Sequence, residues 1–550
     1  MKKILSLIFL VIFLSSTSAF SMSEEERVDD AKYIINLFTQ QYAPLPWKEE
    51  YLGLDFDTIS KNFLNNAANA ASDIEFYDAV VKFLDKFQDT HISYRIPSSY
   101  RSFLYLDFEY FDGKVLIVDI DRKKLSEEVF PFDIGDELIS FDGQSAVEAI
   151  KSLLPYNSYG YLPTSMKLAS WDLTYRPQYR YPYAPIGSVT MSVLRQGESV
   201  PQEVALEWIT KGFNLTEMAP KSSVKYMAET ILPAKTLSLG GADFEHDRQL
   251  SVNSRKTGTN SPTPFFPLWE GFEPRLESPY FTGIFSIGNK KIGFIRVRTW
   301  MVDGYQRLLP ILEKEIAYMN NNTDALIIDQ TSNTGGYGGY AAGAVSYFIT
   351  EPIDHMKMQL RANRGWLSDY ELWADEMSED LLPHFEIWRE IIRDSVEKGE
   401  YLTPPVSTYF PEFIYPNRDK NNNLLIYTKP VLVLVNELAF SAGDKFPSMM
   451  QDWGLAKIFG TRTTGAGGSV TYPKLKKIGN SEMEIALTIN IMYRHKEVMT
   501  DTGIPTHYIE NVGVTPDIEY TITAEDFLNE YKDYRNAIDS AVIDLIEGNN

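Results

Sequence analysis

Apolar residues near the start of the chain recur with the spacing of amphipathic helices. Residues 28–38 carry an i, i+3, i+7 stripe, and a second stripe covers residues 76–87. Ser72 and Glu75 precede the second stripe in the arrangement of a capping box, which marks a helix start. We therefore expect an N-terminal helical region over residues 22–97.

The second of these helices is expected to end near Gln88. Asp89, Thr90 and His91 follow it directly, and residues 92–96 have the apolar character of a strand. His91 is thus placed at a turn from helix to strand. A single histidine at such a turn is, by default, a surface or core residue.

Short alternating segments replace the helical pattern after residue 100. Strands are predicted over 103–108, 114–119, 134–143, 188–194 and 204–208, and a helix over 146–154. Gly135-Asp136 before a strand and Asp142-Gly143 after it make residues 98–210 resemble a PDZ domain. That resemblance implies capture of extended peptides or C-termini by strand addition, and the alternative is a small β domain without a ligand. An aromatic, proline-punctuated insert, Tyr156 to Tyr183, interrupts the pattern.

Residues 211–290 carry little periodicity and are assigned to a long linker. Within them, residues 240–264 are polar and rich in Gly, Asp, Asn, Ser, Thr and Pro. A connection this long without its own pattern is expected to be a mobile loop and a candidate activation segment.

An α/β unit follows the linker. Residues 292–297 and 325–329 are continuous apolar strands, and residues 305–319 between them form an amphipathic helix, which predicts parallel pairing. The second strand runs into the glycines of residues 335–339, followed by a helix of small residues over 340–348. Glycines at such a turn let backbone N–H groups face an anion or oxyanion, although a plain tight turn has the same pattern.

A second strand-to-helix turn carries a serine. Residues 430–435 form an apolar strand, Ser441 lies in the turn, and a helix begins near Lys445. A serine at this position projects its hydroxyl above the sheet edge, as a nucleophile does, without a full G-x-S-x-G motif. The alternative interpretation is a helix N-cap.

Composition narrows the classes of function. The chain has 550 residues, enough for roughly three to four domains of ~150 residues, and 44% of them are hydrophobic. Its formal net charge of −23 argues against nucleic acid or anionic membrane as the main partner. The absence of cysteine excludes thiol nucleophiles, cysteine zinc sites, iron–sulfur ligation and disulfides. Covalent catalysis would have to use oxygen or nitrogen.

The first 21 residues resemble a secretory leader of bacterial style. Lys2 and Lys3 precede an apolar run over residues 4–14, and cleavage is expected after Ala19 or Ser21. The run is shorter than the ~20 residues that span a bilayer, so we expect export without membrane insertion.

Four ordered motifs resemble the C-terminal processing peptidases and the tricorn core. They are Ile327-Ile328-Asp329 with Asn333-Thr334-Gly335-Gly336, then Asn436 with Phe440-Ser441-Ala442-Gly443-Asp444, then Gly460-Thr461-Arg462-Thr463-Thr464-Gly465-Ala466-Gly467, and Asn511-Val512-Gly513-Val514-Thr515-Pro516-Asp517-Ile518. With the PDZ-like stretch, they cover most of the chain after residue 24. The resemblance implies a serine peptidase domain over residues 291–550.

The resemblance also implies which residues are catalytic. One branch of this group uses a lysine after the Thr-x-Gly turn, where this chain has Ala466; the tricorn-like branch uses a histidine after the N-terminal helices and a glutamate before the Gly-Val-x-Pro-Asp motif. His91 and Glu510 match these two positions, so His91 becomes the expected general base for Ser441. Glu510 would orient the imidazole, in one version through the Thr90 hydroxyl. The oxyanion would bind N–H groups of Gly335 or Gly336 and of Ala442.

Other histidines and two lysines are alternative candidates for the base. The other histidines, at 246, 355, 384, 495 and 507, show no metal-ligand spacing, and His507 near Glu510 is the main alternative base. Lys445 and Lys457 lie nearest to Ser441 among the lysines, but neither is expected to reach its hydroxyl.

The sequence therefore predicts an exported α/β (α+β multidomain) protein with N-terminal helices, a PDZ-like domain and a parallel βαβ core. The expected function is a secreted or periplasmic serine endopeptidase made as a zymogen, acting on peptides or unfolded proteins without cofactor or metal. A homodimer is included among its expected assemblies, whereas nucleic acid is not among its partners. The alternative is a non-catalytic, peptide-binding pseudoenzyme that uses its PDZ-like domain.

Overall fold

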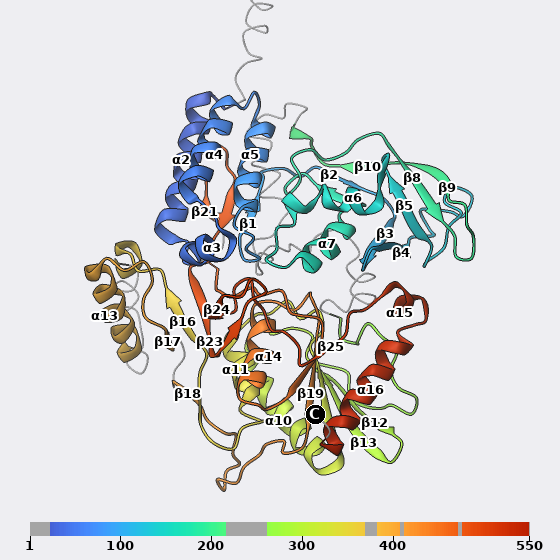
Figure 1. Ribbon diagram of the computed structural model, residues 1–550, viewed down its shortest axis with the longest axis vertical. Helices are drawn as coiled ribbons and strands as arrows, with labels where there is room; N and C mark the ends of the chain where they lie inside the picture. The colour runs from blue at the N-terminus through green and yellow to red at the C-terminus, as the bar shows by residue number, and fades with distance from the viewer. Residues whose placement is uncertain (1–21, 216–260, 369–381, 408–411, 471–475, 549–550) are drawn as a thin grey trace, which may run out of the picture.

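The computed structural model describes residues 22–215, 261–368, 382–407, 412–470 and 476–548 (Figure 1). The predicted leader, residues 1–21, lies outside these ranges. So does most of the predicted activation segment, residues 240–264, of which only 261–264 are described.

Four helices and a short strand form the N-terminal region: α2 (Glu24–Gln41), α3 (Leu45–Leu52), α4 (Phe56–Asn69), α5 (Asp73–Asp85) and β1 (Ser93–Arg95). The two predicted helices are confirmed as α2 and α5, and the Ser72 hydroxyl accepts the Glu75 N–H at the start of α5. Their apolar faces meet in an aromatic cluster in which the rings of Phe38 and Phe87 stack 4.2 Å apart. This packing fixes the end of α5, and with it the turn that carries His91.

Residues 98–211 form an antiparallel sheet with two packed helices. The sheet follows the order β3 (Leu106–Phe111), β4 (Lys114–Ile120), β5 (Glu137–Phe141), β8 (Ser188–Leu194), β9 (Gln202–Glu207), with β6 (Gln144–Ser145) beside β5. A small sheet joins β2 (Arg101–Phe103), β7 (Tyr175–Pro177) and β10 (Ile209–Lys211), and the helical elements are α6 (Ala146–Lys151), η1 (Leu154–Tyr156) and α7 (Leu162–Trp171). The predicted strands are present. The aromatic insert is more than an interruption, because it forms α7, whose Met166 and Ala169 lie in the core of this region.

The C-terminal region is built on a seven-stranded sheet. Its order is β11 (Glu273–Leu276), β12 (Phe281–Ile287), β13 (Lys290–Arg296), β14 (Ala325–Asp329), β19 (Val431–Val435), β20 (Lys457–Gly460), β25 (Ile518–Glu519). Pairing is parallel from β13 onward, as the sequence predicts. Because β14 is buried on both faces, its residues alternate between two cores: Leu326 and Ile328 face one core, and Ala325 and Ile327 face the other.

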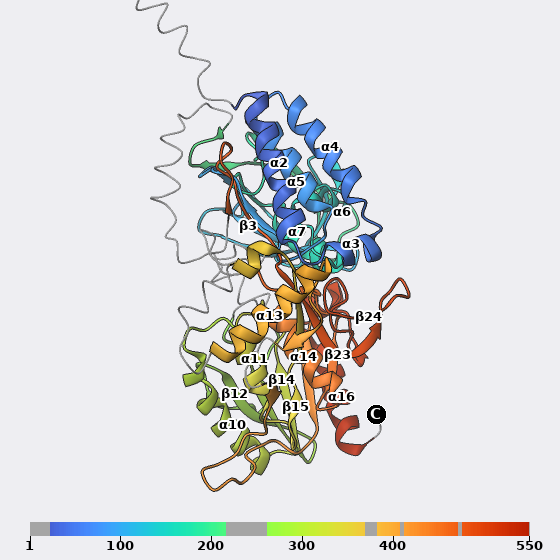
Figure 2. The same ribbon diagram turned by 90° about the vertical axis from the view of Figure 1, so that its left-hand side faces the viewer.

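Helices cover both faces of this sheet (Figures 1 and 2). On one side lie α10 (Leu309–Asn322, preceded by η3, Tyr305–Arg307), α11 (Gly338–Val345) and α14 (Ala442–Asp452). On the other side lies α16 (Lys532–Glu547), preceded by α15 (Ala524–Leu528). The β13–α10–β14 unit agrees with the predicted strand, helix and strand.

Two strands of this sheet come from residues that the sequence assigns to the linker. Strands β11 and β12 pair with each other, and β12 pairs along its whole length with β13. The linker interpretation of residues 211–290 is therefore wrong for residues 273–287. The pattern is weak because the polar Thr282 is buried and Gly283 interrupts the apolar residues, so that only Ser286 is exposed.

Three smaller sheets are also present among the described residues. One has the order β17 (Val406–Ser407), β16 (Lys357–Leu360), β23 (Asn490–Met499), β24 (Pro505–Tyr508), and α13 (Leu382–Lys398) packs against its β16 and β17. Another pairs β15 (Ile353–Asp354) with β18 (Phe413–Ile414). A third joins β1 to β22 (Glu484–Ala486) and β21 (Lys476–Lys477). Because Ser93 pairs with Ala486, the segment just after His91 is held on the C-terminal region. In the described ranges, no helix has the length and apolar character to cross a membrane.

Candidate active site

Ser441 occupies a strained turn between β19 and α14. Its backbone lies at φ 60° and ψ −119°, a region that costs energy for any residue with a side chain. The turn is held by neighbours: the Phe440 N–H donates to Asn333 O (3.2 Å), and Ser441 O accepts the N–H groups of Asp444 and Lys445 (2.9 and 3.0 Å). The Ser441 side chain does not cap the helix. Ser441 thus stands at the N-cap position without a capping hydrogen bond, and its hydroxyl stays available at a partly exposed position.

The glycine turn after β14 lies directly against Ser441. A Cβ placed on Gly335 would come within 2.7 Å of Ser441 Cβ and 2.9 Å of Ala442 N, so only glycine fits there. The two turns meet because β14 and β19 are parallel neighbours, whose carboxyl ends lie at one sheet edge.

Backbone donors for an oxyanion are present near this contact. The Gly335 N–H donates to Asn333 Oδ1 (2.9 Å), so this donor is already used. Within the described ranges, the N–H groups of Gly336 and Ala442 have no acceptor. Of the three predicted oxyanion residues, Gly336 and Ala442 thus retain a free donor, whereas Gly335 supplies the close packing.

His91 is held by Asp89, two residues before it. Asp89 accepts the His91 backbone N–H (2.8 Å) and the hydroxyl groups of Tyr42 and Thr488 (2.8 Å each). The His91 side chain is 4% exposed, and its Nδ1 has no hydrogen-bond partner in the described part of the chain. Burial lowers the pKa of His91, with a smaller contribution from the Lys48 charge, while Asp89 opposes the shift. The imidazole is thus neutral at pH 7, which is the form a general base needs.

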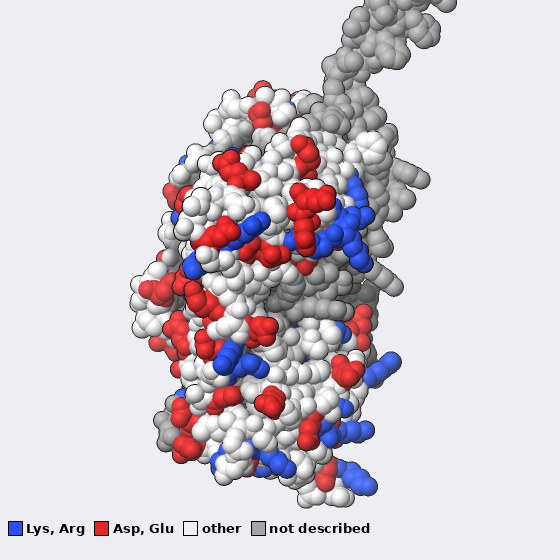
Figure 3. Space-filling view, turned by 90° about the vertical axis from the view of Figure 1, so that its right-hand side faces the viewer, with Lys and Arg blue, Asp and Glu red and all other residues white. Residues whose placement is uncertain are grey.

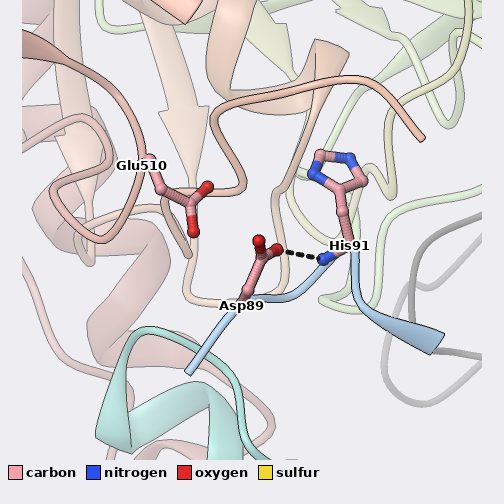
Figure 4. Close-up of side chains that lie close together, drawn as sticks. All are labelled: Asp89, His91 and Glu510. Atoms are coloured by element: carbon pink, nitrogen blue, oxygen red, sulfur yellow. Dashed lines mark hydrogen bonds between the residues drawn. The ribbon is translucent and has the colours of Figure 1, made fainter. Parts of the chain in front are cut away.

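Glu510 lies beside His91 and is fully buried. Its Oε1 accepts from Lys48 Nζ at 2.5 Å, and its Oε2 accepts the Gly467 N–H at 2.8 Å. Burial, reinforced by the Asp89 charge, raises the pKa of Glu510 to about 7, and Lys48 and the Gly467 N–H counteract that rise. Figure 4 shows the Glu510 carboxylate and the His91 imidazole near the Asp89 carboxylate, with a hydrogen bond between Asp89 and the His91 main chain.

A ring nitrogen of His91, an oxygen of Glu510 and an oxygen of Asp89 all lie within 4.8 Å of one another. That spacing is short enough for one divalent cation. However, Lys48 already compensates the Glu510 charge, and both Asp89 oxygens accept hydrogen bonds. These contacts favour proton transfer over metal binding. Within the described ranges, the Thr90 hydroxyl makes no hydrogen bond, so it does not link Glu510 to His91 here.

One turn, residues 463–467, connects the nucleophile to the base and acid. Asp444, in the first turn of α14, accepts Thr463 Oγ1 (2.5 Å) and the N–H groups of Gly465 and Ala466 (2.9 and 3.0 Å). The next N–H, that of Gly467, goes to Glu510. A Cβ on Gly467 would lie 2.2 Å from Glu510 N, so this position excludes any side chain.

Two of the alternative bases, His507 and Lys457, make contacts elsewhere. The ring of His507 stacks on Tyr493 at 4.4 Å, and its Nδ1 lies 3.0 Å from Arg494 O. Lys457 pairs with Asp517 at 3.8 Å and is partly exposed. Lys445 is fully buried in α14, where burial lowers its pKa to about 7.

Sequence reasoning missed three contributors to this site. Asp89 and Asp444 stand inside the quoted motifs, so a hydrogen-bond argument about their turns could have found them. Lys48 carried no signal, because a lysine on an amphipathic helix is normally solvated.

Two regions of the chain match known protein families. Residues 291–520 match the family described as Peptidase family S41, and residues 100–231 match the family described as PDZ domain. An uncharacterized protein of Chlamydia muridarum (strain MoPn / Nigg) is 25% identical over 594 residues, covering 95% of this chain and 93% of that protein. A protein of Chlamydia pneumoniae is 24% identical over 640 residues, covering 100% of this chain and 95% of that one.

Solved structures share the fold over nearly the whole chain. The crystal structure of mature CPAF has a TM-score of 0.75 and 23% identity, covering 96% of this chain and 98% of that one. Mature CPAF complexed with lactacystin has a TM-score of 0.73 and 24% identity, covering 96% and 99%. The predicted resemblance to the processing peptidases and the multidomain α/β fold with a PDZ-like domain are thereby confirmed.

Proposed function

We propose that this chain, which carries a peptidase family S41 domain and a PDZ domain, is a serine endopeptidase with a Ser441–His91–Glu510 apparatus. The observation that carries the proposal is the Ser441 turn. Ser441 has a positive φ, which costs the fold energy, and its side chain makes no capping hydrogen bond. It packs against a glycine turn with free N–H donors, an arrangement that suits a nucleophile. The two domains fit peptide or protein substrates.

The proposed mechanism gives each of these residues one role. Neutral His91 takes the Ser441 proton as the hydroxyl attacks the carbonyl carbon, and then gives that proton to the leaving amine. The N–H groups of Gly336 and Ala442 bind the oxyanion, a contribution of ~3–4 kcal/mol per donor in other hydrolases. A water molecule, activated by the same imidazole, releases the acyl group. Glu510 stabilises the imidazolium formed in each step.

Among the described residues, no hydrogen bond joins Ser441 to His91 or His91 to Glu510, the two contacts that the proposed triad needs. Nδ1 of His91 has no partner in the described ranges, although Glu510 lies nearby. A rotation of the His91 side chain would bring the two groups into contact. We include this step in the proposal, because an open triad fits a chain that becomes active only after processing.

The proposed processing site is the polar stretch over residues 240–264. Relatives of this type can mature by internal self-cleavage, and the stretch has a composition that proteases accept. Purified wild-type protein is expected to convert to two fragments near this stretch, while Ser441→Ala stays intact. Identical fragmentation of both proteins would exclude self-processing.

Export is proposed from the leader. Mass spectrometry of protein from the producing cells is expected to find a first residue after Ala19 or Ser21. An intact Met1 on the accumulated protein would contradict export through this leader. The chain is strongly acidic, with a net charge of −23. Figure 3 shows acidic side chains interspersed with basic ones over the face in view.

Casein cleavage and labelling with a fluorophosphonate probe test the function. The proposal expects cleavage of casein and modification of Ser441, both lost in Ser441→Ala. Neither cleavage nor labelling after prolonged incubation would favour the alternative, a peptide-binding pseudoenzyme.

A further inference from the structure

Among the residues that the structure describes, Lys48 is the one buried cation that contacts the proposed catalytic carboxylate, Glu510. It projects from α3 and is 0% exposed, although lysine is among the residue types least often buried. An ammonium group has three N–H donors, and here all three are used. They go to Glu510 Oε1 (2.5 Å), Asn511 Oδ1 (2.5 Å) and Gln88 O (3.2 Å).

These three acceptors come from the two segments that meet at the site. Gln88 stands three residues before His91, and Glu510 and Asn511 belong to the opposite segment. The Asn511 side chain also donates to Gln88 O at 2.8 Å. Trp47, beside Lys48, donates its indole N–H to Glu510 O at 2.9 Å. Helix α3 thus holds both the main chain and the side chain of Glu510.

We propose that Lys48 is a positioning residue of this peptidase, whose ammonium group keeps Glu510 ionised and aimed at His91. This proposal rests on the proposed function. With Oε1 bound to Lys48 and Oε2 bound to the Gly467 N–H, the Glu510 carboxylate is fixed at both oxygens. A charge-assisted contact at each oxygen leaves one orientation for the carboxylate.

The charges around Glu510 explain why a cation is required. Asp89 and Tyr42 face it from the N-terminal helices, and the His91 imidazole is the third titratable neighbour. Burial and the Asp89 charge both favour the protonated acid, and Lys48 is the opposing positive charge. A protonated Glu510 could not stabilise an imidazolium. Without Lys48, the pKa of Glu510 would therefore rise further and the active form would be confined to higher pH.

The test is a mutant cycle with Lys48→Met, Glu510→Gln and the double variant, measured with a peptide substrate across pH 5.5–9.5. Lys48→Met keeps the length of the side chain and removes the charge. It is expected to lower kcat by about ten- to a hundredfold at pH 7 with little change in KM, the size of a lost charge-assisted hydrogen bond. Part of that loss should be recovered at alkaline pH. Lys61→Met, on the exposed face of α4, is the matched control and should keep the wild-type profile.

The double variant separates positioning from folding. If Lys48 acts through Glu510, the Lys48→Met/Glu510→Gln protein should be no slower than Glu510→Gln alone. The proposal would be overturned if the fold-loss in kcat of the double variant equalled the product of the two single losses. It would also be overturned if the acid side of the pH–rate profile of Lys48→Met were not shifted from that of the wild type. Should Lys48→Met fail to fold, the double variant, which has no unpaired buried charge, still gives this comparison.

The same cycle distinguishes the two hypotheses. A slow Glu510→Gln with a wild-type Lys48→Met rejects only the role of Lys48. A Glu510→Gln enzyme with the wild-type rate rejects the proposed triad itself, and the role of Lys48 fails with it.

Discussion

The two parts of the proposed site, the Ser441 turn and the pair His91 and Glu510, are positioned by different kinds of contact. Ser441 and Gly335 each follow a buried strand, and those strands are hydrogen-bonded neighbours in one sheet. His91 and Glu510 come from segments far apart in the chain, held together by strand pairing of β1 with β22 and by the contacts of Lys48. The first half therefore forms with the sheet, whereas the second depends on how the N-terminal helices dock. Loss of docking should impair proton transfer before it impairs folding of the sheet.

The largest loss of activity is expected when the proposed nucleophile or the proposed base is removed. Ser441→Ala and His91→Ala should each lower kcat/KM by about 10⁴–10⁶-fold, because members of such a unit act together. Initial rates with a fluorogenic peptide, and unfolding curves for each protein, provide the check. A folded His91→Ala enzyme that keeps more than about a tenth of the rate would remove the histidine from the mechanism.

A smaller effect is expected where the two halves share a turn. Gly467→Ala would place Cβ 2.2 Å from Glu510 N, so the Glu510 segment must shift. We expect a loss of about 10²-fold in kcat, the scale of a displacement of ~1 Å near a reacting group. Gly479→Ala is the matched control, since its nearest atom would lie 3.9 Å away. Equal rates for the two variants would contradict the geometry of this turn.

The dependence on pH tests the acid of the pair. Glu510 must be ionised, and its pKa is raised to about 7, so acidification protonates it and the rate should fall about tenfold per unit below pH 7. Burial lowers the pKa of His91, so the imidazole stays neutral further into the acid range. The two groups titrate as a pair, and a profile of log kcat/KM gives their joint value. A flat profile between pH 5 and 8 would count against the pair.

The smallest expected effect concerns the lysines nearest to Ser441. Lys445→Met and Lys457→Met should keep activity within about tenfold, because Lys457 faces Asp517 and Lys445 lies inside α14. The thermal midpoint of each variant is measured alongside the rate. If a folded Lys445 variant were inactive and His91→Ala stayed active, the general base would be Lys445 and not His91.

The two parts of the proposed site also differ in how well the sequence predicts them. Strand β14, strand β19 and the turn with Ser441 were predictable, because period, glycine and strand ends are local signals. The roles of His91 and Glu510 followed only from family resemblance, since no local pattern joins them. Lys48 was not predictable, because burial of a lysine depends on helix docking. Strand β12 was missed because the buried Thr282 and Gly283 interrupt its apolar residues, which weakens the alternation.

The most direct test of the central claim is the rate of fluorophosphonate labelling, mapped by peptide mass spectrometry in wild type and His91→Ala. We predict labelling at Ser441 alone in the wild type, and labelling slowed by at least about 10³-fold without the imidazole, since a neutral serine is a weak nucleophile. Modification of another residue, or an equal rate in the two proteins, would contradict it.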